Sequence, residues 1–477
     1  MDKVTVKSGV KNFVYTSIAQ VSNLILNSLL TLIVPMFLNI EAYSYWQLFF
    51  FYASYSGFFQ FGLNDGVYLR YGGKKYDELD KSVMKSQLVL LVVSQIIISI
   101  VIFAYINFIV TDGDRGYVLL TTAVCIIITG ITTFFWHILQ ATNRIKEYAK
   151  SIMIDKILLI VFIAIFVGFS IDSFKFLIAF NLFTRLIGLL YCCLCCKDII
   201  FAKTDYYKNS IKELGLNVSS GIKLMLSNIS SMLILGSGKM IIDKVWGVVV
   251  FGKVSFAVSL TNFILLFVNQ ISIVIFPTLK KLNEEELKKV YSFVRELLNI
   301  ILLSVFLFYI PAKFFVGLIL PKYSESMIYF MLVLPLCTFS GKMQLLFNTY
   351  MKVLREEGKL LFLNAISVII AIILCAISAW VFDSIVLVVI SMTVTAIIRS
   401  IMAEIYLSNL LNVKFWKSII IDVLYSVGFI IITLIFDNII SFCIYLTIYL
   451  IYMFLNRKNL KTLYNKLISF MKRKDDV

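Results

Sequence analysis

Several cationic side chains fall inside stretches of the sequence that are otherwise apolar, and they suggest the chemistry that the chain could support. Arg185 is eleven residues into the apolar stretch 174–196, so at ~1.5 Å of helical rise per residue it lies close to the middle of a bilayer. Placing an arginine there costs ~2.5–3.5 kcal/mol on the lenient insertion scale. Water, a counter-charge or a bound substrate must therefore be nearby. Lys253 lies in the outer half of the eighth apolar stretch, and Lys223 lies near one end of the seventh, where snorkelling to the interface explains it equally well.

Carboxylates that could balance these cations deep in the membrane are scarce. Asp65, Asp155, Glu404 and Asp422 all lie toward the ends of their stretches that are expected on the cytoplasmic side. Lys342 adds a cation in the inner half of the tenth stretch. The interior charge is therefore predicted to be net positive, and a cationic cavity attracts anions. Diphosphates are strong candidates, because Lys and Arg bind them both as charges and as hydrogen-bond donors.

Polar side chains also recur along one face of several predicted helices. In the first apolar stretch the steps between them are three or four residues, which keeps Gln20, Asn23 and Asn27 on one side of a helix. The eighth stretch carries Asn262 and Asn269 in a similar way. Such residues serve either as hydrogen-bonding contacts between packed helices or as the lining of a water-filled cavity. A stripe along the full helix favours the cavity, because helix contacts need only one or two such residues.

Motifs for catalysis or metal binding are missing from the sequence. The chain has one histidine, His137, and it lacks the P-loop, GxSxG and HExxH patterns. Four of the eight cysteines cluster as Cys192, Cys193, Cys195 and Cys196, without the paired CxxC spacing of a zinc site. Disulfides are not expected at a cytosolic position. We therefore expect a protein that is not an enzyme, with no metal and no cofactor.

The elements that carry these residues are membrane-spanning helices. The 477 residues are 60% hydrophobic and 15% charged, whereas a soluble chain has charges at about a quarter of its positions. The apolar stretches are continuous rather than alternating, which indicates helices and not a barrel. We predict an all-α integral membrane protein with about fourteen spans, near 12–38, 43–65, 86–110, 117–139, 151–171, 174–196, 217–242, 246–276, 291–316, 325–351, 360–382, 384–406, 416–436 and 438–456.

The distribution of basic residues predicts the orientation of these spans. Most of the 44 lysines and arginines fall at the two ends and in the even-numbered connections, and few fall in the odd-numbered ones. By the positive-inside rule both termini are cytoplasmic. The net charge of +16 is then explained by topology signals near anionic lipid, so nucleic acid is not expected as a partner.

The order of spans suggests two lobes and a terminal pair of helices. A long polar connection at 197–216 separates residues 1–196, with spans one to six, from residues 217–412, with spans seven to twelve. Two such bundles related by pseudo-two-fold symmetry are a common transporter plan. Residues 413–477 add two helices and a basic cytoplasmic tail.

A glycine-rich segment follows the second span and has the composition of a hinge or gate. Gly62 and Gly66 permit backbone angles that other residues avoid. Asn64 and Asp65 can cap a helix end or accept hydrogen bonds from loop amides. Arg70 is then expected within reach of Asp65 for an ion pair. A rigid turn that ends the span and a moving cytoplasmic gate both fit this segment.

This segment, GLNDGVYLRYGG at 62–73, together with YWQLF at 45–49, resembles the second span and following loop of bacterial Wzx-type oligosaccharide flippases. These flippases belong to the multidrug/oligosaccharidyl-lipid/polysaccharide exporter superfamily. The plan of two six-span lobes with two extra helices is similar to that superfamily over the whole chain.

The resemblance implies a flippase that moves an undecaprenyl-diphosphate-linked oligosaccharide from the inner to the outer leaflet of the bacterial plasma membrane. Arg185 would then anchor the diphosphate with help from Lys223 and Lys253. The glycan path would be lined by the five amides named above: Gln20, Asn23, Asn27, Asn262 and Asn269. The resemblance also implies a glycan polymerase and glycosyltransferases as partners besides the lipid-linked substrate.

Two other functions stay open at this point. A cation-coupled multidrug exporter of the same superfamily would need acids deep in the membrane. A membrane-embedded glycan polymerase or ligase would normally have sizeable external loops, and the predicted external loops are short.

Overall fold

The computed structural model describes residues 25–26, 29–169, 172–279, 283–436, 438–455 and 457, with the backbone alone for 207 and 267–279. Within these residues all regular structure is helical, which confirms the all-α fold class. In the same part of the chain, ten helices are long and apolar enough to cross a membrane, or eleven if a bent pair is counted as one span. One of these helices is long enough to contain two predicted spans, so the total of fourteen stays a prediction.

The chain divides into two compact units, which we describe separately. Unit 1 comprises Met1–Gly236 and Ile242–Ser255, and unit 2 comprises Ser237–Ile241 and Phe256–Val477. This division assigns the predicted connection at 197–216 and the start of the seventh span to unit 1. The two lobes inferred from the sequence stay a prediction.

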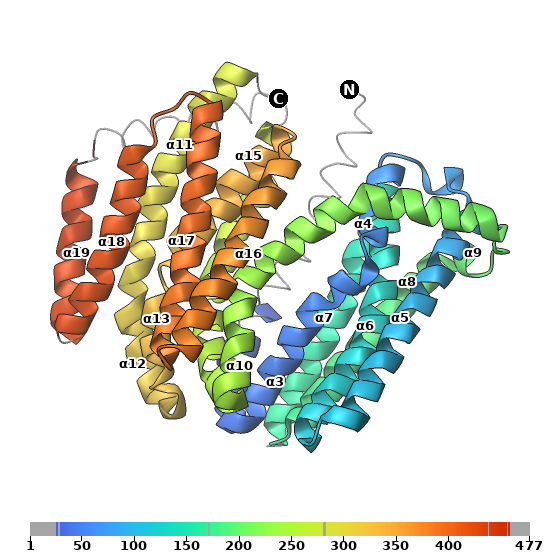
Figure 1. Ribbon diagram of the computed structural model, residues 1–477, viewed down its shortest axis with the longest axis horizontal. Coiled ribbons are helices and arrows are strands. Elements are labelled where there is room, and N and C mark those ends of the chain that lie inside the picture. The colour runs from blue at the N-terminus through green and yellow to red at the C-terminus, as the bar shows by residue number, and fades with distance from the viewer. Residues whose placement is uncertain are drawn as a thin grey trace. The chain divides into compact units, whose positions relative to one another are not determined.

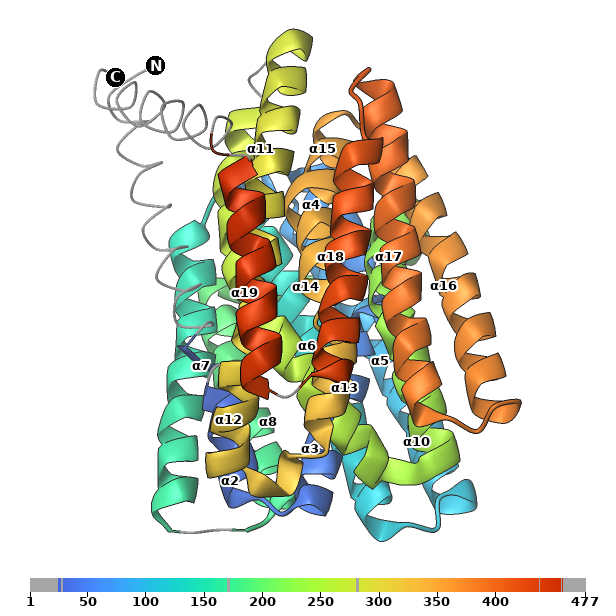
Figure 2. The same cartoon turned by 90° about the vertical axis from the view of Figure 1, so that its left-hand side faces the viewer.

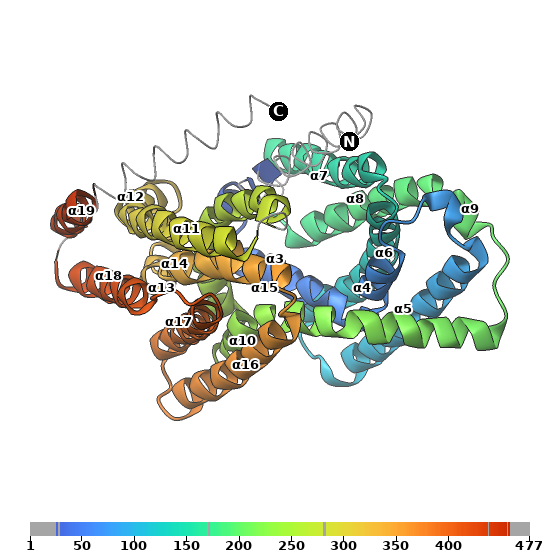
Figure 3. The same cartoon turned by 90° about the horizontal axis from the view of Figure 1, so that it is seen from above.

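Unit 1 contains the helices from α2 to α9 and parts of α10 (Figure 1). They are α2 (Val34–Phe37), α3 (Ile40–Ser54), α4 (Leu63–Tyr71), α5 (Lys81–Ile109), α6 (Gly113–Ala141), α7 (Ile145–Gly168), α8 (Phe174–Cys195) and α9 (Lys197–Ile200), with the 3-10 segments η1 (Tyr55–Gln60) and η2 (Tyr76–Glu78). Helix α6 is central, because it contacts α3, α4, α5, α7 and α8. Figure 3 shows α4 and α8 beside it.

Local sequence signals explain where several of these helices begin. Helices α3, α5 and α6 start after Asn39, Asp80 and Asp112, and each of these side chains accepts hydrogen bonds from backbone amides of the first turn. Such caps satisfy amides that have no partner inside the helix. The apolar faces then pack around α6, with Phe134, Phe135 and other fully buried side chains in the core of unit 1.

Helix α10 (Tyr207–Leu279) spans 73 residues and is interrupted at Gly247, whose φ of 83° and ψ of 177° are not helical. The predicted spans 217–242 and 246–276 both lie in this helix. Only glycine adopts such a backbone conformation readily, so the helix is interrupted at Gly247, the second residue of predicted span 246–276.

Unit 2 contains the remaining helices. They are α11 (Glu284–Ser304), η3 (Val305–Phe308), α12 (Tyr309–Ile319), η4 (Pro321–Tyr323), α13 (Ser326–Val333), α14 (Leu336–Lys342), the π-helical turn η5 (Met343–Phe347), α15 (Asn348–Val353), α16 (Glu357–Trp380), α17 (Ile385–Leu410), α18 (Trp416–Ile435) and α19 (Asn438–Leu455). Helices α16 and α17 form an antiparallel pair that turns at Asp383. Helices α18 and α19 pack against each other and against α11 (Figure 2).

The predicted span 325–351 is bent in the structure. Ser326–Val333 and Leu336–Val353 meet at 40°, and Pro335 lies at the bend. Proline lacks the amide hydrogen that the helix would use and its ring clashes with the preceding turn, which explains the break.

Candidate functional site

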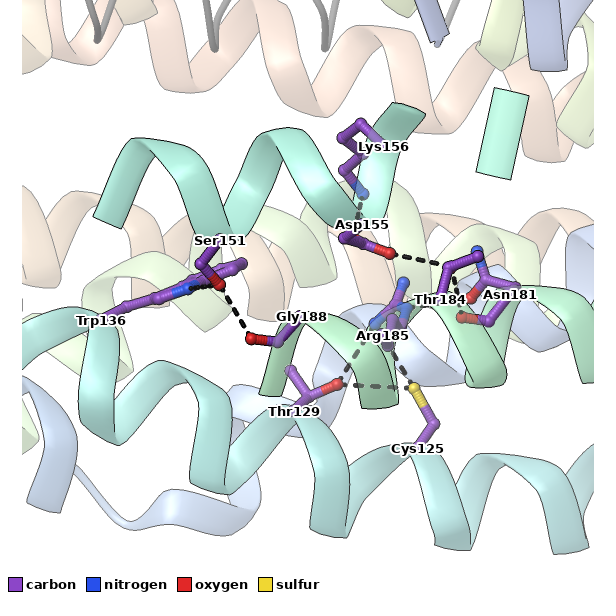
Figure 4. A network of polar contacts seen from close by, with 10 residues as sticks. All are labelled: Cys125, Thr129, Trp136, Ser151, Asp155, Lys156, Asn181, Thr184, Arg185 and Gly188. Carbon is purple, nitrogen blue, oxygen red and sulfur yellow. Dashed lines mark hydrogen bonds and ion pairs between the residues drawn. The ribbon is translucent and has the colours of Figure 1, made fainter. Parts of the chain in front are cut away.

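Arg185 lines a pocket of about 350 Å³ inside unit 1, between α6, α7 and α8 (Figure 4). The volume lies within the usual range of small-ligand sites, ~300–1,000 Å³. Each helix contributes side chains at steps of three or four residues, which is the spacing of a single helical face. The polar and aromatic residues of the lining are Thr129, Thr132, Trp136, Tyr148, Asp155, Lys156 and Arg185.

The Arg185 guanidinium is held in place by neutral partners. Its Nε donates to Asn181 Oδ1 at 2.9 Å, one helical turn earlier on α8. Its Nη1 donates to Thr129 Oγ1 at 3.2 Å and to Cys125 Sγ at 3.4 Å, both on α6. Among the described residues no carboxylate pairs with Arg185 and no partner is found for Nη2. The side chain is thus oriented, half-buried and left with donors for a ligand.

Asp155 lies in the same pocket, and its charge is balanced locally. One carboxylate oxygen is 3.0 Å from Lys156 Nζ, and the other accepts a hydrogen bond from Thr184 Oγ1 at 2.9 Å. Since Lys156 offsets Asp155, Arg185 contributes a net positive charge to the pocket. An anionic group can therefore bind at Arg185 without meeting an uncompensated carboxylate.

Two aromatic rings form the end of the pocket away from Arg185. The Trp136 indole N–H donates to Ser151 Oγ at 3.0 Å, and Ser151 in turn donates to the Gly188 carbonyl at 3.1 Å. Tyr148 packs perpendicular to Trp136, with the ring centroids 5.8 Å apart. These contacts fix the plane of the indole against α7 and α8, and Figure 4 shows the contacts through Ser151 and Gly188.

Arg185 was predicted from the sequence, whereas most of its surroundings were missed. A signal was present, because Tyr148, Ser151 and Asp155 share one face of α7 by spacing, as do Asn181, Arg185 and Gly188 on α8. These stripes mix polar with aromatic and apolar residues, so they are less conspicuous than a row of amides.

The other residues predicted to bind substrate are not gathered in this pocket. Lys223 is exposed on α10 and Lys253 is half-buried on the same helix, and neither lines the pocket around Arg185. Asn262 is exposed and belongs to unit 2. The side chain of Asn269 lies outside the described residues, as do the predicted path residues Gln20, Asn23 and Asn27. Their role in lining a path stays a prediction.

The glycine-rich segment forms a tight turn into α4. Phe61 and Gly62 both have left-handed backbone angles, with φ of 51° and 78°. Asn64 was expected to cap a helix end or to accept hydrogen bonds from loop amides. Gly62 occupies the cap position of α4 instead, and no side chain among the described residues caps this helix. Asn64 is fully buried, and its amide donates instead to the Gly130 carbonyl at 3.0 Å and to Thr133 Oγ1 at 2.8 Å on α6.

The expected ion pair between Arg70 and Asp65 is not formed. Arg70 Nη1 instead contacts Glu213 Oε2 at 2.8 Å and Asn217 Oδ1 at 2.6 Å, both on α10. Helical side chains meet at separations of three or four residues, whereas five residues place them on different faces. The sequence separation alone was therefore misleading.

Helices α4 and α10 approach so closely that their backbones touch. A Cβ atom on Gly66 would overlap the Asn217 carbonyl, and one on Gly221 would overlap the Gly62 carbonyl. A Cβ on Gly62 would lie 2.6 Å from the Ile222 nitrogen. Glycine is thus required at these positions by contact between helices.

Unit 2 buries the cation Lys342, which was expected from the sequence to contribute to a positive interior. Its ammonium forms an ion pair with Asp422 and donates to Ser418 Oγ at 3.1 Å, and both charged side chains are almost completely buried. A second buried pair in unit 2 is formed by Arg295 and Glu404, whose charged atoms lie 3.7 Å apart. Lys342 is therefore neutralised within unit 2, and the case for a cationic site depends on Arg185.

The solved structures that resemble the described fold include two MATE transporters and one flippase. An inward-facing multidrug resistance MATE family transporter of the MOP superfamily has a TM-score of 0.61 and 14% identity, covering 81% of this chain and 95% of that one. Lipid II flippase MurJ in its inward closed conformation has a TM-score of 0.59 and 15% identity, covering 94% and 100%. An outward-facing MATE family transporter has a TM-score of 0.51 and 12% identity, covering 84% and 96%. The described fold is thus similar to that of these MATE transporters and of the flippase MurJ.

A family model identifies the family to which the chain belongs. The model of the polysaccharide biosynthesis protein family matches residues 47–328, so the chain belongs to that family. A comparison with curated proteins gives no match. The resemblance to the exporter superfamily, stated from the sequence, is confirmed at the level of family and fold.

Proposed function

We propose that this protein flips an undecaprenyl-diphosphate-linked oligosaccharide from the inner to the outer leaflet of the bacterial plasma membrane. A polar glycan cannot cross ~30 Å of hydrocarbon unaided. The polysaccharide biosynthesis family supplies the biological setting, and the fold is one used by a lipid II flippase and by multidrug exporters.

The observation that carries the proposal is the state of Arg185. Its guanidinium is oriented by Asn181 and Thr129, has no acidic partner among the described residues and faces a pocket of about 350 Å³. Arginine binds phosphate oxygens through paired N–H groups as well as charge. In the proposal Arg185 anchors the diphosphate while the lipid tail stays in the bilayer.

The rest of the mechanism follows from the general behaviour of alternating-access transporters. The two lobes would rock between inward-open and outward-open states around the bound head group, with both termini cytoplasmic. The glycan would pass along the amide stripes predicted from the sequence. Lys223 and Lys253 would assist outside the Arg185 pocket, and glycosyltransferases and a glycan polymerase would supply and consume the substrate.

A charge series at position 185 tests the anchor. We expect Arg185→Ala to weaken binding of undecaprenyl diphosphate about 10- to 100-fold, because a charge-assisted hydrogen bond contributes ~1.5–3 kcal/mol. Arg185→Lys should retain part of the affinity and Arg185→Glu none. In cells, deletion of the gene or Arg185→Glu should trap lipid-linked oligosaccharide on the cytoplasmic leaflet.

A matched control separates this effect from a general change of charge. Lys150→Glu alters an exposed lysine on α7 that does not line the pocket, so it should transport normally. Full surface polysaccharide from correctly inserted Arg185→Glu protein would remove the anchor role.

A cation-coupled drug exporter is the main alternative, because MATE transporters share the fold. The pocket argues against it, since its buried carboxylate, Asp155, is already paired with Lys156. An exporter of cations requires an acid that is free to attract them. Greater sensitivity to cationic drugs after deletion, with normal surface polysaccharide, would favour the exporter.

A further inference from the structure

The Arg185 pocket has an aromatic end as well as a cationic one, and an anion alone does not require both. Thr129 contacts the guanidinium and Trp136 lies seven residues further along α6. At ~1.5 Å of rise per residue, these ends are about 10 Å apart along the helix. The pocket is therefore longer than a single phosphate site needs to be.

The Trp136 ring is presented in a defined orientation. Its only polar atom is satisfied by Ser151, which also donates to Gly188 and accepts from Cys192 at 3.0 Å. Because the N–H is occupied, what the indole offers to the pocket is ring surface. Tyr148 packs against it edge to face and supports that orientation.

The lining of the pocket also carries donors and acceptors of both signs. Asp155 and Lys156 form an ion pair there, and Asp155 is buried. Because Lys156 neutralises Asp155, this pair adds no net charge for a phosphate to bind. It can instead bind hydroxyl groups, since the carboxylate accepts their hydrogens while the lysine donates.

These three features together match the chemistry of a sugar diphosphate. The guanidinium fits the diphosphate, the Asp155–Lys156 pair fits hydroxyls, and the indole fits the apolar face of a pyranose ring. The volume, about 350 Å³, is near the lower limit for ligand sites. It suits a diphosphate with one sugar and is too small for several sugars.

We propose that the pocket holds the diphosphate together with the sugar directly attached to it, and that Trp136 stacks on that sugar. This inference rests on the proposed flippase function and deepens it. The protein would thereby recognise the start of the glycan, which is a feature shared by repeat units of any length. The remaining sugars would lie outside the pocket.

Binding to two classes of lipid tests the proposal. The purified full-length chain in nanodiscs is titrated with bare undecaprenyl diphosphate and with undecaprenyl diphosphate carrying one N-acetylglucosamine or one galactose. We expect at least one glycosylated lipid to bind about three- to tenfold more tightly than the bare lipid, the range expected for an aromatic contact. Stacking uses the carbon face that pyranoses share, so either sugar is a suitable probe.

Substitutions of Trp136 identify the origin of this advantage. Trp136→Leu should abolish the preference for the glycosylated lipid, because it weakens binding of that lipid far more than binding of bare undecaprenyl diphosphate. Trp136→Phe keeps a ring and should restore most of the preference. Trp380→Leu, at an exposed tryptophan of α16 in unit 2, is the matched control and should behave as the wild type.

The outcomes separate this inference from the proposed function. Any of three results would overturn the sugar site. The wild type could show no preference, Trp136→Leu could retain the preference, or a folded Trp136→Leu protein could lose affinity for both lipids equally. If the wild type binds neither lipid, the flippase proposal itself fails. Arg185→Ala should weaken both lipids to the same extent.

Discussion

At the scale of single residues, the charge balance of the Arg185 pocket determines what it can bind. Lys156 offsets Asp155, and the contacts of Arg185 itself are with uncharged atoms of Asn181, Thr129 and Cys125. A half-buried cation that lacks an acidic partner is costly in a membrane, unless a ligand or water accepts its remaining hydrogen bonds. The pocket can therefore accept an anion at Arg185, because no carboxylate among the described residues pairs with this side chain.

Substitutions of Asn181 test this balance without touching Arg185. Asn181→Asp keeps the size of the side chain but places a carboxylate at Nε of Arg185, so we expect affinity for undecaprenyl diphosphate to fall more than tenfold. Asn181→Ala removes one hydrogen bond to Arg185, worth ~1 kcal/mol. It should lower the affinity for undecaprenyl diphosphate about fivefold. Titration in nanodiscs measures both effects.

The control for this series is Asn107→Asp on α5, an exposed asparagine whose amide bonds only to the backbone of its own helix. It should bind as the wild type does. Unchanged binding by Asn181→Asp would show that Arg185 does not contact the diphosphate.

The sequence was sufficient to select a residue by its depth in the membrane. It was not sufficient to predict which side chains would contact that residue. The position of Arg185 in its apolar stretch was sufficient to select it. Its contacts with Thr129 and Cys125 depend on how α6 and α8 pack, which sequence spacing does not define. For the same reason Arg70 was assigned to Asp65, although its partners lie on α10.

At the scale of elements, the contact between α4 and α10 shows how the glycine-rich segment functions structurally. Gly62, Gly66 and Gly221 allow the two backbones to touch, and Arg70 adds an ion pair with Glu213 beside this crossing. The sequence predicted that glycines here serve backbone freedom. That holds for Gly62, whereas Gly66 and Gly221 are needed for space.

Alanine substitutions distinguish crowding from flexibility at this crossing. Gly66→Ala and Gly221→Ala force a methyl group into backbone atoms and should each destabilise the protein by ~1–3 kcal/mol or more. Gly215→Ala, on the same α10 but with nothing within 4 Å, should stabilise it by up to ~1 kcal/mol, because alanine favours helix. Thermal unfolding in detergent compares the stability of the three variants. Equal stability of all three would contradict the close backbone contact between α4 and α10.

The buried ion pair between Lys342 and Asp422 connects α14 to α18. Removing one partner leaves an uncompensated charge, so Lys342→Met and Asp422→Leu should each destabilise by ~3–5 kcal/mol. The double variant should be more stable than either single variant, because no charge remains. Lys289→Met, at an exposed pair with Glu285, is the control and should leave the melting temperature unchanged. Additive losses in the double variant would show that the two side chains do not interact.

At the scale of the whole molecule, the sequence predicted the class of structure correctly, whereas its division into two lobes stays a prediction. Continuous apolar stretches were sufficient to predict an all-helical membrane fold. Residues 243–245 separate predicted spans seven and eight, whereas α10 runs through these residues and is interrupted at Gly247, inside predicted span eight. The packing that assigns parts of α10 to different units involves residues distant in sequence, so the hydropathy pattern cannot reveal it.

The predicted orientation applies to the molecule as a whole. If the basic connections are cytoplasmic, reporter proteins fused to either terminus should also lie in the cytoplasm. An alkaline phosphatase fusion should be inactive and a green fluorescent protein fusion fluorescent at both ends. Opposite results at the two termini would require an odd number of spans.

The Lys342–Asp422 pair also constrains how the chain is made. The two residues are separated by 80 positions, and a ribosome adding ~5–20 residues per second needs ~4–16 s to cover them. During that interval the lysine has entered the membrane before its carboxylate exists. We therefore expect the nascent chain to depend on temporary shelter for this ammonium, and chains that end before α18 to be removed by quality control.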